Sequence, residues 1–281
     1  MSIWYALVDL LPFEWAEPGR MLFMKNALLA ILVISPLFGL LSTMVVEKRM
    51  SFFSDALGHS AFTGIAAGTL AGFADPSWCA VALAVAFALL FTFVRERTSL
   101  ASDTVIGVFS STGVALGIFL STLGGRSFTK FNTLLVGDIL SVTPGKIGLL
   151  ALILALVLVL WYVSLNKLVL AAVHPALAHS RGIRLWREEA VFNCAVAAVV
   201  TLTMSWVGLL VINSLLVLPG AAARNISGNL RRYTLYALLT AVVSGVAGLM
   251  VSYYIGASAG ASITLICAMC FAATYLLREK R

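Results

Sequence analysis

Charged residues are scarce in this sequence. Only 11% of the 281 residues are Asp, Glu, Lys or Arg, whereas a soluble globular domain carries about 25%. Hydrophobic residues make up 61% of the chain and occur in long uncharged runs. This composition excludes a soluble domain and predicts an all-α polytopic membrane helix bundle, in which every backbone polar group is satisfied inside its own helix.

Signatures of several chemistries are also missing. The sequence has no GxxxxGK[ST], so it is not expected to bind ATP through a P-loop, and it has no HExxH. Its four cysteines lie in or beside apolar runs and imply no disulfide framework. We therefore expect no catalytic residues, no permanently bound cofactor and no enzymatic activity in this chain itself.

Apolar windows of about 20 residues mark the predicted spans. The run 190–223 is too long for one crossing and is expected to turn near residues 205–208; if it only dips and returns, the count is eight instead of nine. The predicted spans are about 22–46, 55–73, 78–94, 103–123, 147–165, two within 190–223, 233–253, and a last one ending near residue 277.

The basic residues predict the orientation of the chain. With nine spans, 14 of the 19 Lys and Arg residues fall on the side of the C-terminus, which makes that side cytoplasmic. The net charge of +7 therefore reflects orientation in a lipid membrane and not nucleic-acid binding. We expect one transmembrane domain over residues 1–281, with its longest soluble excursion, 166–189, on the inner side. That excursion is either a plain loop or a docking helix for a soluble partner, with His174 and His179 exposed.

The stretch 51–72 holds an acid and an imidazole inside an apolar segment. Asp55 and His59 are four residues apart and so share one helix face. Ionisable residues at such a place indicate a functional site; the alternative is a pair that caps the helix entrance. Carboxylate and imidazole together suit zinc, manganese or iron, and two copies meeting at the Gly64 and Gly68 stripe would supply four ligands. The nine-span scheme places the pair nearer the inner leaflet.

Two further acids lie in or beside apolar segments. Asp103 follows Ser102 at a predicted helix start, which favours a first-turn role. The stretch 124–146 is too polar to cross the membrane, but it contains the short apolar piece LLVGDIL, which we interpret as a half-helix or interfacial segment. Asp138 lies in this Gly-flanked break. Irregular backbone at membrane depth must be buried in protein or line water. Asp138 is therefore a candidate pathway residue, with a structural role as the alternative.

Several motifs, in order along the chain, resemble those of the membrane permease subunits of the zinc/manganese/iron ABC importer family. Each motif alone is weak, but together they cover about residues 40–270. They are EKRMSFFSDALGHSAFTGIAAG, SDTVIGVFSSTGVALGIFL, LLVGDILSVTP, LLVINSLLVLPGAAARNIS and GLMVSYYIGASAGASITL.

This resemblance implies a type II-like ABC importer permease in the cytoplasmic membrane of a prokaryote. Its implied partners are a second permease, either another copy or a sister chain, two separate ATPase subunits and an extracytoplasmic metal-binding protein. By position, Asp55 and His59 match the family's intramembrane metal pair. The segment 166–189 matches its cytoplasmic coupling segment, with His174, Pro175, Ala178 and Gly182 at the ATPase contact.

The sequence departs from the family pattern at two places. The coupling segment often reads Asp-Pro-acid-x-Ala, but here it is HPALA, and the last external turn, 256–262, has no acid.

The rival interpretation is a secondary transporter or channel that works without an ATPase. It would be marked by a second set of intramembrane charges, whereas only isolated acids are present here.

Overall fold

The computed structural model describes residues 2–10, 12–19, 21–73, 75–123 and 137–278. This part of the chain is helical throughout and contains no strand, as the composition predicts. Its helices are α1 (Ser2–Val8), η1 (Glu14–Ala16), α2 (Leu22–Glu47), α3 (Phe53–Leu70), α4 (Ser77–Arg97), α5 (Ser102–Leu123), η2 (Ile139–Ser141), α7 (Pro144–Val173), α8 (Pro175–Ser180), α9 (Leu185–Val207), α10 (Leu209–Ile226), α11 (Leu230–Ile255) and α12 (Ala259–Arg278).

Nine of these helices correspond to the nine predicted spans. Eight of them, within the described residues, are long and apolar enough to cross a membrane on their own. The exception is α3, whose acid, imidazole, hydroxyl groups and glycines lower its hydropathy. Because α3 packs against α4, α5, α9 and α10, it is shielded by protein and does not need a wholly apolar surface.

The predicted turn within residues 190–223 is confirmed, and it connects two complete crossings. Gly208 separates α9 from α10 with φ of 95°, a conformation that favours glycine. Gly208 borders a pocket together with residues 137–139 and 258–260. Near the opposite ends of the same two helices, Glu189 binds Lys48 and Arg224 binds Glu47. The run therefore crosses the bundle to Gly208 and returns, which supports nine crossings over eight.

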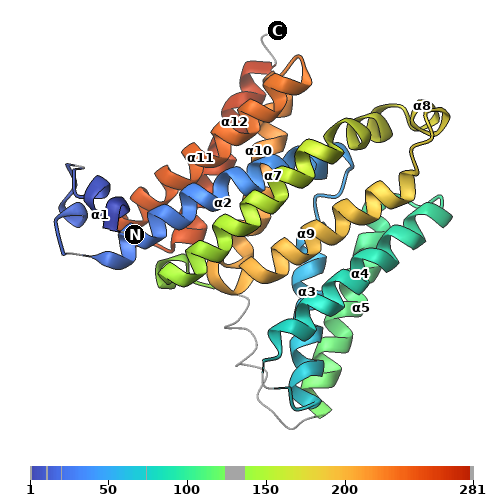
Figure 1. Cartoon of the computed structure of the whole chain (residues 1–281), viewed down its shortest axis with the longest axis horizontal. Coiled ribbons are helices and arrows are strands. Elements are labelled where there is room, and N and C mark those ends of the chain that lie inside the picture. Colours follow the sequence, from blue (N-terminus) through green and yellow to red (C-terminus); the bar gives the residue numbers. More distant parts are fainter. Residues whose placement is uncertain (1, 11, 20, 74, 124–136, 279–281) are drawn as a thin grey trace.

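Alternation of the helices defines two ends of the bundle. We call the end with loops 48–52, 98–101, 174–184 and 227–229 the inner end, and the end with loops 71–76, 137–143 and 256–258 the outer end. Figure 1 shows α8 projecting at the inner end, while α1 lies beyond the opposite end of α2.

The helices form two groups that share α9 and α10 as their junction. In one group α3, α4 and α5 pack together beside α9; in the other α2 packs against α7, α10 and α11, with α12 behind α10 and α11 (Figure 1). The core of the second group is α2, whose side chains Ile34, Leu37 and Phe38 are fully buried.

Ion pairs connect the helices at the inner end. Glu189 of α9 lies 3.3 Å from Lys48, which follows α2, and 3.5 Å from Arg95 of α4. Glu188 pairs with Lys167 of α7 at 3.0 Å. Two acids that are neighbours in sequence thus hold the start of α9 against three other helices.

The predicted soluble excursion 166–189 is shorter than expected. Helix α7 continues to Val173 and α9 already begins at Leu185, so only residues 174–184 lie outside the long helices. Lys167, Glu188 and Glu189 are helical residues that satisfy each other or neighbouring helices across the inner end. Their mutual pairing explains why charges occur there without a loop.

Candidate functional site

Asp55 and His59 lie on one face of α3, as their spacing predicts. The Nε2 atom of His59 is 3.4 Å from Oδ2 of Asp55, and the side chains are 31% and 44% exposed, respectively. Asp55 occupies the first turn of α3, where the helix dipole stabilises a carboxylate. The capping alternative for the pair is not supported, because the residue before α3, Phe52, provides no side-chain cap and neither side chain of the pair bonds to the backbone there.

The pair lies deeper in the bundle than the inner-leaflet level expected from the span scheme. Gly113 lies at the midpoint of α5. An ideal Cβ atom built on it would lie 3.7 Å from the carbonyl carbon of His59 and 3.8 Å from its Cβ. Asp55 meets Asn213, the fifth residue of α10 from its outer end. The cause is the segment 48–52, which enters the bundle before α3 begins: Met50 and Phe53 are both fully buried.

Asn213 is a site residue that the sequence reasoning missed. Its Nδ2 donates to Oδ1 of Asp55 at 3.4 Å, while its own Oδ1 is buried and has no hydrogen-bond partner among the described residues. An amide in this position orients the carboxylate, as the outer partners of metal ligands do. The signal was present in the motif LLVINSLLVLPG, where Asn213 is the one amide side chain in an apolar run.

One chain supplies only part of a metal site. No cluster of three or more His, Cys, Asp and Glu side chains occurs within the described ranges. Asp55 and His59 thus offer one oxygen and one nitrogen ligand, and both remain open to further ligands because they are partly exposed. A stable zinc site usually has four ligands, so a pair alone suits transient binding.

The Gly64 and Gly68 stripe does not serve as the expected contact between two copies. A Cβ on Gly64 would meet the Cα of Ala80 at 2.6 Å, and one on Gly68 would meet Cys79 at 2.9 Å. The stripe is therefore filled by α4 of the same chain, as small residues allow in membrane helices. A site shared by two copies at this stripe is excluded.

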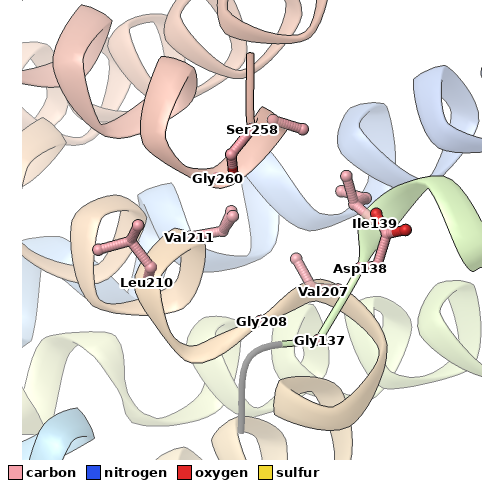
Figure 2. A pocket seen from close by; sticks show the side chains of 10 residues that line it. Gly137, Asp138, Ile139, Val207, Gly208, Leu210, Val211, Ser258 and Gly260 are labelled. Carbon is pink, nitrogen blue, oxygen red and sulfur yellow. The ribbon is translucent and has the colours of Figure 1, made fainter. Parts of the chain in front are cut away.

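Asp138 lies beside a pocket at the outer end. Its carboxylate accepts a hydrogen bond from the backbone N–H of Leu140 at 2.9 Å and so caps η2. The same residue borders a cavity of about 430 Å³ together with Val207 and Val211, and Figure 2 shows it on the side of the cavity opposite Leu210. The structural role is thus present, and the pathway role stays a prediction. Residues 124–136, which include the first three residues of the expected half-helix LLVGDIL, lie outside the described residues.

The predicted coupling residues surround the short helix α8. His174 precedes α8 and Pro175 is its first residue; Ala178 is fully buried, and Gly182 follows with φ of 73°. His174 and His179 are exposed, as expected. Asp103 lies exposed in the first turn of α5, which agrees with its predicted role.

The part of the chain that the structure describes is a bundle of long apolar helices around a partly exposed acid–imidazole pair, the architecture of a polytopic membrane protein. Residues 20–278 match the ABC 3 transport family. The chain belongs to the ABC 3 transport family, and the predicted kinship with the permease subunits of metal-ion ABC importers is confirmed. It is a multi-pass protein of a prokaryotic membrane.

Named relatives cover nearly the whole chain. The high-affinity zinc uptake system membrane protein ZnuB of Haemophilus influenzae is 28% identical over 257 residues, covering 90% of this chain and 97% of that protein. The manganese import system permease protein ScaB of Streptococcus gordonii is 26% identical over 259 residues, covering 92% of each. The solved structure of PsaBC from Streptococcus pneumoniae in complex with Fab has a TM-score of 0.76 at 24% identity and covers 98% of this chain and 95% of its own. At that identity the likeness supports the fold alone.

Proposed function

We propose that this permease carries a divalent transition metal, zinc, manganese or iron, inward across the cytoplasmic membrane, driven by a separate ATPase subunit. The observation that carries the proposal is the Asp55–His59 pair at mid-depth, with a polar partner on α10. Ionisable side chains are costly at that depth in a membrane, so their presence indicates a function such as binding a transported ion. The names of the zinc and manganese relatives support a metal of this class.

The half-open pair also supports a second permease copy as partner. A carboxylate that is 44% exposed at mid-depth in one chain would face hydrocarbon unless another surface covered it. A second copy that covers this face, away from the Gly64 stripe, would bring two more ligands to the pair. The ion would then pass between the copies, held by few enough ligands to leave again.

Metal is proposed to reach the pair from the outer end. An extracytoplasmic metal-binding protein would deliver it above the pocket beside Asp138, whose exposed carboxylate is the one acid among the described residues that line this pocket. On the inner side, the segment 166–189 would transmit ATP hydrolysis, with His174, Pro175, Ala178 and Gly182 forming the ATPase contact.

Metal uptake in cells that carry this chain with its ATPase tests the proposal. Asp55→Asn and His59→Gln should each abolish ATP-dependent uptake of one metal among zinc, manganese and iron, at matched abundance in the membrane. Asp103→Asn, at an exposed helix start, is the matched control and should transport normally. Unchanged uptake in Asp55→Asn and His59→Gln would show that the pair is not on the path. Uptake that does not depend on the ATPase would favour the secondary transporter.

The ATPase contact is tested separately by cross-linking. Leu177 in α8 is 45% exposed and Leu10 near the opposite end is 79% exposed. Leu177→Cys should cross-link to the ATPase and Leu10→Cys should not. Cross-linking from Leu10→Cys instead would reverse the predicted orientation.

A further inference from the structure

A basic groove lies between α7 and α9 at the inner end. Together with the turn after α8, these two helices enclose a cavity of about 760 Å³. Four cationic side chains line it: Lys167, Arg181, Arg184 and Arg187. One carboxylate, that of Glu188, lines it too and is bound to Lys167 at 3.0 Å. The groove therefore carries an excess of three positive charges.

The three guanidinium groups of the groove are available to a ligand. Arg181, Arg184 and Arg187 are exposed, and in the chain as described none of them pairs with a carboxylate. Elsewhere at this end, Arg95 and Arg224 each have an acidic partner. An uncompensated cluster of this kind matches a ligand with negative charge, and phosphate oxygens accept the bidentate hydrogen bonds that arginine donates.

The groove also has apolar side chains that face outward. Val163 of α7 is 60% exposed and Val191 of α9 is 48% exposed, as expected of side chains that contact acyl chains. The uncharged part of α7 from Ile147 to Asn166 is 20 residues long, which spans about 30 Å, the thickness of the hydrocarbon core. Lys167 therefore begins the headgroup layer. Trp186, 41% exposed at the start of α9, suits the same level.

We propose that the basic groove binds the phosphate headgroup of an anionic phospholipid, whose acyl chains run down the membrane along Val163 and Val191. Arg184 and Arg187 would hold the phosphate, with Lys167 and Arg181 at the sides. A free phosphate would satisfy the same cations but would leave the apolar walls uncovered, so the combination favours a lipid. This inference does not depend on the metal path.

Lipid binding to the purified, delipidated full chain tests the proposal. Native mass spectrometry would measure the affinity for phosphatidylglycerol and for phosphatidylcholine with the same acyl chains. We expect the wild-type chain to prefer phosphatidylglycerol. Arg184→Gln combined with Arg187→Gln should weaken that binding about 25-fold, taking about 5-fold for each cation near the membrane surface. The pair Arg184→Lys and Arg187→Lys should retain most of the preference and shows that the fold tolerates change there.

The matched control removes the same charge at the same end. Arg231 and Arg232 are exposed at the start of α11, and replacing both by Gln should leave phosphatidylglycerol binding unchanged. An equal loss of phosphatidylglycerol binding in both double variants would mean that the basic end attracts anionic lipid without a specific site, and it would overturn the proposed binding groove. Equal binding of the two lipids in the wild type would do the same. Displacement of the lipid by inorganic phosphate in excess would assign the groove to a soluble anion. Loss of ATPase binding without loss of lipid would assign it to the partner subunit.

Discussion

Glu189 joins three helices at the inner end, and its replacement by glutamine gives a sharp test of the structure. Glu189 forms an ion pair with Lys48, whose side chain is only 2% exposed. Its Nζ lies 3.3 Å from Glu189 and 5.4 Å from the ring centroid of Phe192. Glu189→Gln keeps the shape of the side chain but leaves this buried ammonium without a carboxylate.

The expected loss of stability follows from the burial of Lys48. Removing one partner of a fully buried pair costs about 3 to 5 kcal/mol. Because Glu189 is 26% exposed, we expect about 2 to 3 kcal/mol, which lowers the apparent Tm by about 5 to 10 °C for a chain of this size. The neighbouring Glu188→Gln breaks a pair whose lysine is 45% exposed, and there about 1 kcal/mol or less is expected. Both variants would be compared with the wild type by thermal unfolding in one detergent.

The loss should also depend on pH. Burial lowers the pKa of Lys48, and the carboxylate of Glu189 raises it part of the way back. The cost of a charged Lys48 is fully present below its folded-state pKa and is relieved as pH rises toward the unfolded value. In Glu189→Gln the pKa falls further, so Lys48 becomes neutral at a lower pH. The difference in unfolding free energy between Glu189→Gln and the wild type should therefore become smaller as pH rises above neutral. Equal losses of stability in Glu188→Gln and Glu189→Gln, or a difference that does not change with pH, would refute the reasoning.

Three further predictions concern packing, backbone and site. Gly64→Val should destabilise the chain by more than about 2 kcal/mol, because the new side chain meets the backbone of α4; Gly107→Val, with open space around its Cα, is the control in the same thermal assay. Gly208→Ala should cost about 1 to 3 kcal/mol because its φ of 95° strains any other residue, whereas Gly148→Ala, near the start of α7 with open space around its Cβ position, should be neutral or stabilising; the reverse order would contradict this. If the proposed function holds, Asn213→Ala should fold but slow metal uptake, since the carboxylate of Asp55 loses its orienting donor; normal uptake would make the amide dispensable.

Much of the fold could be predicted from the sequence because each crossing helix needs its own apolar run. The boundaries of α2, α4 and α5 follow the predicted spans closely, and the turn at Gly208 follows from a run too long for one crossing. The ends of α7 and α9 were missed, because Lys167, Glu188 and Glu189 read as a loop in one dimension. Only the fold brings these charges together to neutralise each other.

The candidate site was predicted only in part, because contacts within one helix can be read from spacing and contacts between distant segments cannot. Asp55 and His59 meet within a single helix, so their spacing was sufficient. Asn213 joins them from 158 residues further along the chain, and a single amide in an apolar run does not reveal its partner. The glycine stripe was correctly read as a surface for close approach, but spacing alone does not tell whether the approaching helix belongs to the same chain.

The polar character of α3 has a consequence for how the protein is made. Segments leave the ribosome in order, and a helix enters the bilayer unaided only when its own residues favour lipid over water. Eight of the long helices described meet that condition and α3 does not. The Asp55–His59 pair therefore lies on the segment least able to insert alone, so α3 is expected to remain at the translocon until α4 and α5 emerge and to enter the bilayer with them. A nascent chain stopped before α4 should leave α3 accessible to water-soluble reagents, and one stopped after α5 should protect it.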